Sequence, residues 1–381
     1  MSEERRPDKT FKPNLKVEGL YTNIENIDIF EPEWSVMSEV EGREQAWFWP
    51  NVVPLHTSTI LAGIGGIGKS LLLLNIISHV TNGEKAIICG DEVIFPIGNV
   101  ILMSAEDDIH SQIQPKLKAM NADLKKIHFI KSKIGNISKK KRFIELDIDL
   151  HILEDKLIKL KEIQERVSLI VIDPVTYFLG KVRDRDNIEV ANFLQGLNDL
   201  AEKYDLAIIL NKHLRKQASG GLKGLIDATN EISGASSWVN TPRMCWLVTA
   251  WHDDPTIKVM TNAKQNLISV EDTQMAYAYR IISHEGRGKL QWLDSKMCIN
   301  SSQAMNKETY EMGKLEQGIE FILNYLKKNG QSRYDSIVEE AIKSGIKKKT
   351  IRSASEKFEQ DYQDDIEISR GIKNAKVYRL V

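Results

Sequence analysis

Residues 63–70, GIGGIGKS, constrain the fold more than any other part of the chain. They fit the pattern G-x-x-x-x-G-K-[ST], in which Gly63 opens the loop, Gly68 closes it, and Lys69 and Ser70 follow. The preceding run, TSTILA, is typical of a buried strand, and the following run, LLLLNIISHV, of a helix that is apolar on nearly every side. This order predicts a phosphate-binding loop (P-loop) inside a sheet domain. An ordinary glycine turn between strand and helix is the alternative.

Such a loop points successive backbone N–H groups at phosphate oxygens, and the first turn of the helix adds its positive dipole end. Lys69 would place its charge on the β- and γ-phosphates, and Ser70 would offer a hydroxyl to Mg²⁺. ATP and Mg²⁺ are therefore the expected cofactors. The expected nucleotide-binding residues are Gly63, Gly65, Gly66, Ile67, Gly68, Lys69, Ser70 and Leu71.

Composition limits the class of protein. The chain has 381 residues, a formal net charge of -1 and 28% charged residues, unlike a uniformly basic nucleic-acid coat. A local basic patch would still suffice for DNA binding. The three cysteines are scattered and lack metal or redox spacing. Because the sequence contains no apolar run of membrane-spanning length and no apolar signal segment near Met1, we expect a cytoplasmic protein without a membrane partner.

Short apolar runs alternate with helical patterns through the middle of the chain. The clearest predicted strands are TSTILAG, GNVILMSAE, KIHFIK, VSLIVIDP, LAIILNKH and MCWLVTAW. Continuous apolar strands separated by helices predict an α/β fold with a mostly parallel, twisted sheet, and shorter strands follow over 258–293, where antiparallel pairing is an option. The predicted division is an N-terminal arm at 1–44, an ATPase domain at 45–295, a polar linker at 296–313 and a second domain at 314–381.

Four further points in this domain can carry chemistry. Asp173 ends an apolar strand, where a second carboxylate of a phosphate site would reach Mg²⁺ through water. Glu106 ends another and could orient or deprotonate the attacking water, although Asp107 and Asp108 compete for this role. His213 ends a third strand and could sense the γ-phosphate. The fourth point is a pair of later cations, Arg243 and Lys264, which could stabilise charge on a neighbour's phosphoryl group or form surface salt bridges.

The ordered set WFWPNVVPLHTSTILAGIGGIGKS, ILMSAED, LIVIDP, ILNKH and SSWVNTPRMCWLV resembles the RepA-type hexameric helicase family over about residues 46–295. That family comprises RecA-like P-loop ATPases of plasmids, phages and other mobile elements. The resemblance implies a RecA-like fold and a homo-oligomer, with a hexameric ring as the expected assembly. It also implies residue roles: Glu106 as catalytic glutamate, Asp173 as metal-site aspartate, His213 as sensor, Arg243 as the neighbour's arginine finger and Lys264 as the lysine of a K-x-N element.

The chain departs from the family pattern at two pairs of residues. His56 and Thr57 stand where Gly-Lys is common, and Asn211 and Lys212 precede His213 where a second histidine is often present. The second departure leaves the details of the sensor open.

In rings of this type, loops after the Asp173 and His213 strands contact DNA, which is expected to be single-stranded in the channel. The cations in these loops are Lys181, Arg183, Arg185, Arg215, Lys216 and Lys223. The loops GKVRDRDN and LRKQASGGLKGL contain no aromatic residue for base stacking, so solvated loops are the alternative.

The C-terminal segment has its own pattern. Three predicted helices, LEQGIEFILNYLKKNG, SRYDSIVEEAIKSG and KKKTIRSASEKF, precede a predicted two-stranded wing. This order resembles a winged helix-turn-helix, with a recognition helix beginning near Lys347. The basic residues expected to contact DNA there are Lys347, Lys348, Lys349 and Arg352. A protein-docking module is the alternative.

The sequence thus predicts an ATP hydrolase that translocates on or unwinds DNA during replication of a mobile element, with a primase or an initiator protein as a possible further partner. One alternative is a DNA-stimulated ATPase that loads or regulates a replication or recombination protein without unwinding. Another is a DNA-binding regulator gated by nucleotide.

Overall fold

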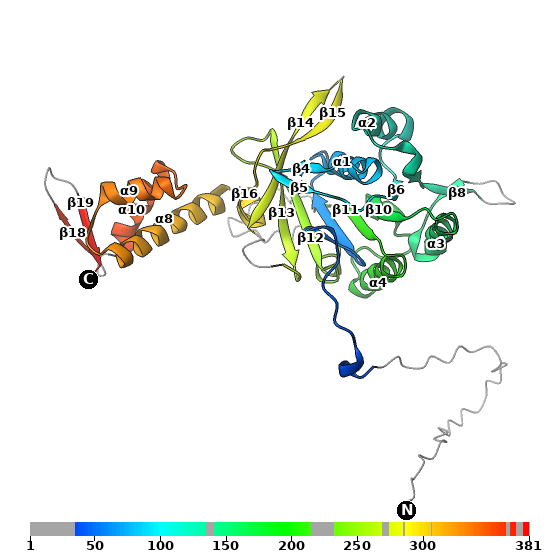
Figure 1. Ribbon diagram of the computed structural model, residues 1–381, viewed down its shortest axis with the longest axis horizontal. Helices are drawn as coiled ribbons and strands as arrows, with labels where there is room; N and C mark the ends of the chain where they lie inside the picture. Colours follow the sequence, from blue (N-terminus) through cyan, green and yellow to red (C-terminus); the bar gives the residue numbers. More distant parts are fainter. Residues whose placement is uncertain are drawn as a thin grey trace, which may run out of the picture. The chain divides into compact units, whose positions relative to one another are not determined.

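The computed structural model describes residues 35–134, 141–214, 232–268, 274–284, 286–305, 307–362, 366–370 and 376–380 (Figure 1). Contacts divide the chain into two compact units, residues 1–44 and residues 45–381. The described part of the first unit contains a short 3-10 helix, Met37–Glu39. The described elements of functional interest lie in the second unit.

A large sheet forms the centre of the ATPase region, with the strand order β15-β14-β13-β12-β3-β11-β10-β6-β7. Six neighbouring strands are parallel: β12 (Met244–Ala250), β3 (Ser58–Gly63), β11 (Ala207–His213), β10 (Val167–Asp173), β6 (Asn99–Ser104) and β7 (Ile127–Phe129). The other four pair antiparallel: β13 (Ile257–Gln265), β14 (Met275–His284), β15 (Arg287–Trp292) and β16 (Met297–Cys298), which pairs with β14. This mostly parallel sheet confirms the predicted α/β class, and each predicted strand of the region is present.

Helices cover both faces of this sheet (Figure 1). They are α1 (Lys69–Asn82) and α2 (Gln114–Ala119) on one face, and α3 (Leu146–Glu162) and α4 (Asn187–Lys203) on the other. Successive strand residues alternate between the two cores: Leu61 packs with α1, whereas Ile60 packs with α3 and α4. Burial on both faces explains why the parallel strands are continuously apolar.

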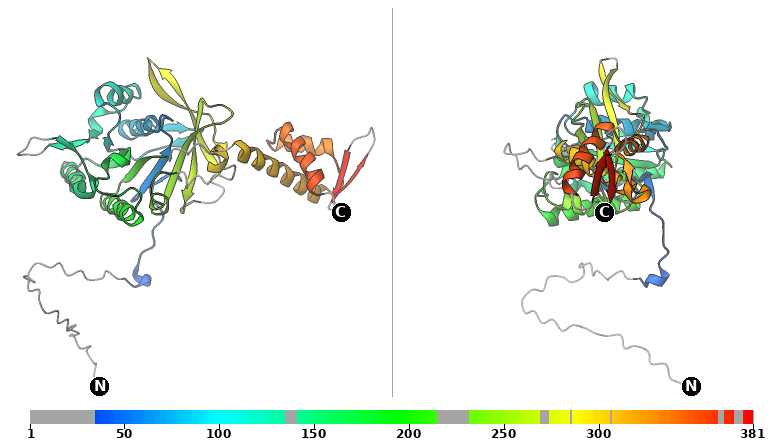
Figure 2. Two further views of the ribbon diagram at one scale, coloured as in Figure 1. Left: turned by 180° about the vertical axis from the view of Figure 1, so that it is seen from behind. Right: turned by 90° about the vertical axis from the view of Figure 1, so that its left-hand side faces the viewer.

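Smaller elements surround this sheet. They are the hairpins β1 (Trp47–Trp49) with β2 (Val53–Pro54), β4 (Ala86–Ile88) with β5 (Asp91–Val93), and β8 (Ser132–Ile134) with β9 (Lys141–Phe143), the π-helix η3 (Ile109–Ile113), the 3-10 helices η4 (Leu124–Lys126) and η5 (Val175–Phe178), and α5 (Ser237–Asn240). The hairpin of β14 and β15 extends past the neighbouring strands (Figures 1 and 2).

The C-terminal segment has a core of its own. It contains α8 (Lys307–Asn329), β17 (Ser332–Arg333), α9 (Tyr334–Lys343), α10 (Lys348–Asp361), β18 (Ile366–Arg370) and β19 (Lys376–Leu380). The three strands pair antiparallel in the order β17-β19-β18. Ile322 of α8 and Ile351 and Phe358 of α10 form a buried cluster with Tyr378 of β19. The three predicted helices and two predicted strands are therefore present.

The segment that we expected to be a polar linker, 296–313, has regular structure. It contains β16, α7 (Ser301–Met305) and the first residues of α8, which begins well before the predicted helix. Ile299 and Ala304 are buried in a small cluster with Trp251 and Val259. Before α8, the few apolar residues of this polar stretch fall in two short groups, at 297–299 and 304–305, which give little periodic signal, so packing against β13 was not predictable from composition.

Candidate functional site

The P-loop joins β3 to α1 at the carboxyl edge of the sheet. Gly66 and Gly68 have positive φ angles of 74° and 102°, which glycine adopts without a Cβ penalty, and Gly68 is the N-cap of α1. A Cβ on Gly63 would lie 2.6 Å from the carbonyl oxygen of Val248. Gly65 and Gly66 are exposed, whereas the side chains of Ile67 and Leu71 are in the core. The structure therefore leaves backbone N–H groups as the groups that these last two residues can offer to a nucleotide.

The hairpin of β14 and β15 borders this loop. A Cβ on Gly68 would lie 2.5 Å from Cδ1 of Ile281, and a Cβ on Gly288 would lie 3.6 Å from Cδ2 of Leu71. These residues of the hairpin were not predicted as part of the site, because nothing in the local sequence indicates that a strand so distant along the chain packs here.

Lys69 is folded back onto the loop. Its Nζ donates hydrogen bonds to the carbonyl oxygens of Gly63 at 2.8 Å and Ile64 at 2.9 Å. Burial lowers the pKa of Lys69 to about 8, and the carboxylates of Asp173 and Glu106 oppose that shift. A phosphate in the loop would give this desolvated ammonium the counter-charge that the two neutral carbonyls do not supply.

Asp173 ends β10 and is buried beside the P-loop. Its carboxylate accepts hydrogen bonds from the side chains of Asn211 and Ser70. Burial raises the pKa of Asp173, the two hydrogen bonds oppose this shift, and the negative charge of Glu106 adds to it. A buried carboxylate beside a hydroxyl is the oxygen donor set that Mg²⁺ prefers, so Ser70 and Asp173 fit the predicted metal position.

Glu106 is the acid of its turn that faces the nucleotide site. Its Oε1 lies 3.5 Å from Nε2 of His213. Asp107 instead pairs with Lys116 at 3.2 Å, and Asp108 caps the π-helix by accepting the backbone N–H groups of His110 and Ser111. The geometry therefore favours Glu106 over its two neighbours for water activation.

β11 presents alternate side chains to different environments. Asn211 and His213 point towards Asp173 and Glu106, whereas Lys212 between them points to the other face. Lys212 is fully buried, forms an ion pair with Asp184, and lies with Nζ 4.2 Å from the ring centroid of Trp238.

The Asp184 carboxylate also accepts a hydrogen bond from Nε1 of Trp238 at 2.9 Å. Burial lowers the pKa of Lys212, and its bond to Asp184 opposes the shift. The cluster Lys212–Asp184–Trp238 joins the segment after β10 to β11 and α5. The sequence showed Lys212 only as a departure from the family pattern.

Arg243 and Lys264 lie away from the P-loop of their own chain. Gly63 pairs with Val248 along β12, whereas Met244, next to Arg243, pairs with Thr59 near the start of β3. Five residues at about 3.3 Å each thus separate Arg243 from Val248. Arg243 is exposed, and it lies at the amino edge of the sheet, opposite the P-loop. The structure therefore does not bring Arg243 together with Lys69 within one chain.

Lys264 lies next to Arg243 across the β12–β13 pair, since Cys245 pairs with Lys264. Its Nζ donates to the carbonyl oxygens of Asn240, at 3.2 Å, and Pro242. Burial lowers the pKa of Lys264, and the positive charge of Arg243 adds to that shift. Arg243 and Lys264 therefore form a small positively charged cluster at the amino edge of the sheet.

The predicted DNA contacts differ in their surroundings. Arg183 is held by Asp186 and Glu189, each at 2.7 Å, whereas Lys181 and Arg185 are exposed. Lys347, Lys348, Lys349 and Arg352 are exposed at the start of α10, and Arg352 reaches Glu356 at 3.4 Å. Arg215, Lys216 and Lys223 lie outside the described residues.

Tyr177 was missed by the sequence analysis. It lies in η5, four residues after Asp173, and is 52% exposed. It places an exposed aromatic ring two residues before the segment 179–186, whose own sequence contains no aromatic residue. Its proximity to the aspartate was visible in the sequence, but its exposure was not.

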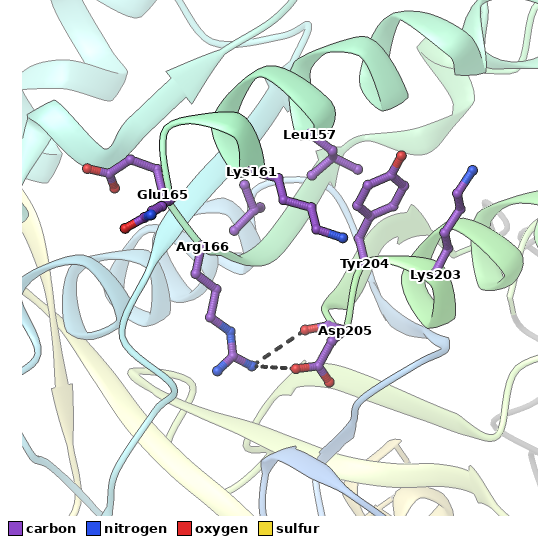
Figure 3. Close-up of a pocket in the computed structure, with 9 residues that line it drawn as sticks. Leu157, Lys161, Glu165, Arg166, Lys203, Tyr204 and Asp205 are labelled. Atoms are coloured by element: carbon purple, nitrogen blue, oxygen red, sulfur yellow. Dashed lines mark hydrogen bonds and ion pairs between the residues drawn. The ribbon is translucent and has the colours of Figure 1, made fainter.

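A pocket of about 390 Å³ lies at the amino edge of the sheet, where β10 and β11 begin (Figure 3). Arg166 crosses it to the carboxylate of Asp205 at 3.0 Å, and His56 reaches the same carboxylate at 2.7 Å. None of the predicted catalytic residues lines this pocket. The contacts of Arg166 and His56 with Asp205 join the chain segments that lead into β10, β3 and β11. We therefore assign His56 a structural role.

Comparison with protein families gives the class of this domain. Residues 30–219 match a family described as an AAA domain. The chain therefore contains an AAA-type, RecA-like P-loop ATPase domain, a class that binds nucleotide. A comparison with curated proteins gave no match.

Across the described residues, no helix is both long and apolar enough to cross a membrane. Arg243, Lys264 and α10 lie beyond the matched range.

Proposed function

We propose that this protein is an ATP-driven DNA translocase or helicase of the RepA type, which works as a homohexameric ring in the replication of a mobile element. The observation that carries the proposal is the division of its charged groups between two sheet edges. Glu106 and His213 meet beside the P-loop, whereas Arg243 and Lys264 lie together at the opposite edge. A cation so placed serves hydrolysis when it enters the site of a neighbouring subunit.

The residues at the P-loop fit ATP hydrolysis. The backbone from Gly63 to Ser70 and the ammonium of Lys69 would hold the phosphates, while Ser70 and Asp173 would hold Mg²⁺. When bound, Mg²⁺ neutralises charge on the phosphates. Glu106 accepts the proton of the attacking water, and His213 links that glutamate to the end of β11.

DNA would contact the segments that follow β10 and β11, with Arg185 and Lys181 as exposed cations and Tyr177 as an aromatic neighbour. The C-terminal helices and strands have the order of a winged helix, so α10 would read duplex DNA through Lys348, Lys349 and Arg352. A primase or an initiator protein would be the further partner, and the ring would act in the cytoplasm.

Strand displacement on a forked DNA substrate tests this function, combined with native mass measurement in ATP and Mg²⁺. The proposal predicts a hexamer, DNA-stimulated ATP hydrolysis and displacement. Hydrolysis without displacement would favour an ATPase that loads or regulates another protein. The ion pairs of Arg183 with Asp186 and Glu189 support that second candidate, because they reduce the free positive charge of a proposed DNA loop. Binding of DNA that depends on nucleotide but does not stimulate hydrolysis would favour a nucleotide-gated regulator.

A further inference from the structure

A polar hollow of about 720 Å³ lies beyond β7, at the carboxyl ends of β6 and β7. Three different segments supply its walls: the π-helix η3, the residues that follow β7, and the outer part of α3. The polar groups that line it include Lys131, Lys156, Lys159, His110, Ser132 and Asp155. Neither the P-loop nor the predicted DNA contacts are part of this hollow.

The three lysines lack ion-pair partners among the residues that the structure describes. Within the described part of the chain, none of Lys131, Lys156 and Lys159 forms an ion pair, unlike Lys116, which is held by Asp107. The carboxylate of Asp108, at the rim, is occupied by backbone N–H groups of η3. The positive charge of Lys156 adds to burial in lowering the pKa of His128 nearby. The lining carboxylates of Asp108 and Asp155 offset two of the three lysine charges, so the hollow keeps a net positive charge towards an anion.

An exposed aromatic ring lies beside Lys131, one of these lysines. Phe143, at the end of β9, is 43% exposed, and Nζ of Lys131 lies 5.8 Å from its ring centroid. Cations that follow a phosphate backbone, together with a ring on which an unpaired base can stack, are the chemistry of single-strand recognition. Bases in a duplex are already stacked and would not use the ring.

We propose that this hollow binds single-stranded nucleic acid, with Lys131, Lys156 and Lys159 on successive phosphates and Phe143 against a base. The inference rests on the proposed action on DNA and adds a second contact, outside the segments after β10 and β11. Because β6, β7, β10 and β11 are parallel, the hollow shares their carboxyl edge with the P-loop.

The hollow also adjoins the catalytic turn. Asp108 and His110 line it and follow Glu106 by two and four residues, and Asp108 fixes the start of η3. A strand bound there would contact the turn that positions the catalytic carboxylate. Occupation of the hollow would therefore contribute to the stimulation of ATP hydrolysis by DNA.

The test is binding of fluorescent oligo-dT by the full chain at several salt concentrations. In the triple variant Lys131→Gln/Lys156→Gln/Lys159→Gln, the slope of log affinity against log salt should fall by about 2, since each phosphate contact on a single strand contributes about 0.7. Phe143→Ala should weaken binding about fivefold to a hundredfold. The matched control is Lys118→Gln/Lys125→Gln/Lys161→Gln, three exposed lysines without ion pairs in the described part, and it should keep the wild-type slope.

Wild-type affinity and slope in the triple variant would overturn the hollow as a binding site, even if DNA still stimulates ATP hydrolysis, in which case the proposed function stands. A second pair of results would also overturn the proposal: poly-glutamate competes with oligo-dT for wild type as well as unlabelled oligo-dT does, and Phe143→Ala binds oligo-dT like wild type. Together they would indicate an acidic protein segment as the occupant. Wild-type protein that does not bind oligo-dT at low salt would contradict both proposals.

Discussion

Oε1 of Glu106 lies 3.5 Å from Nε2 of His213, so the turn after β6 and the last residue of β11 meet beside the P-loop. Among the three consecutive acids of that turn, Asp107 is paired with Lys116 and Asp108 is used as a helix cap. The contact with His213 thus distinguishes one carboxylate from two chemically similar neighbours.

Glu106→Gln should bind ATP as wild type does but hydrolyse it at least about 10²-fold more slowly, because the amide cannot accept the proton of water. Nucleotide affinity and single-turnover hydrolysis check this. Asp107→Asn serves as the control and should retain most of the activity. The assignment is wrong if Asp107→Asn or Asp108→Asn loses hydrolysis and Glu106→Gln does not.

Removing Asp184 and removing Lys212, the two members of the buried ion pair, should lower the free energy of unfolding by different amounts. Asp184→Ala leaves a fully buried lysine without a counter-charge and should lower the free energy of unfolding by about 3–5 kcal/mol. Lys212→Met should lower the free energy of unfolding much less. The Met side chain can pack on Trp238, and the Asp184 carboxylate keeps its hydrogen bond from the indole N–H and its partial exposure to solvent. Urea unfolding of both variants measures the difference, and equal costs would contradict this account.

The pH dependence of this pair has a defined sign. Since burial lowers the pKa of Lys212 below its unfolded value of 10.5, the unfolded chain binds more protons between the two values. In that alkaline window, wild type should gain stability relative to Lys212→Met as the pH rises. A relative loss over the same window would show that Lys212 is not desolvated as the structure indicates.

Local patterns in the sequence predicted the P-loop, the strands and the strand ends that carry Asp173, Glu106 and His213. The strands and these positions could be predicted because P-loop proteins place short motifs at the ends of buried strands. The cluster of Lys212, Asp184 and Trp238 could not be predicted in this way, since Asp184 lies 28 residues from Lys212 and 54 from Trp238. The hollow beyond β7 likewise needs three separate segments to fold together.

Arg243→Ala should bind ATP nearly normally but hydrolyse it poorly, because its guanidinium would serve the site of the next subunit. Mixing it with Glu106→Gln creates interfaces that hold an intact Glu106 on one side and an intact Arg243 on the other. These composite sites should regain hydrolysis, since an arginine finger supplied in trans contributes about 10³–10⁵ in rate.

The rescue should disappear on dilution below the assembly concentration. If mass measurement shows mixed oligomers that remain inactive, Arg243 acts within its own subunit or only supports the fold.

The start of α10 should contribute to duplex binding without affecting hydrolysis. Lys348→Gln/Lys349→Gln/Arg352→Gln removes three exposed cations, so the salt slope for duplex DNA should fall by about 2.7, while basal ATPase activity stays the same. Lys327→Gln/Lys328→Gln, on α8, is the control and should bind duplex like wild type. An unchanged slope in the α10 variant would indicate that this segment docks protein.

The central claim is hydrolysis of ATP at the P-loop, and the most direct test is steady-state ATPase activity of purified Lys69→Ala beside wild type. The side chain of Lys69 is buried in the loop, with its pKa lowered to about 8 by desolvation and its ammonium bonded to carbonyl oxygens at the position where phosphate would bind. We expect Mg²⁺-dependent turnover in wild type, and in Lys69→Ala both loss of turnover and strongly weakened nucleotide binding. Wild-type turnover in Lys69→Ala would contradict the account.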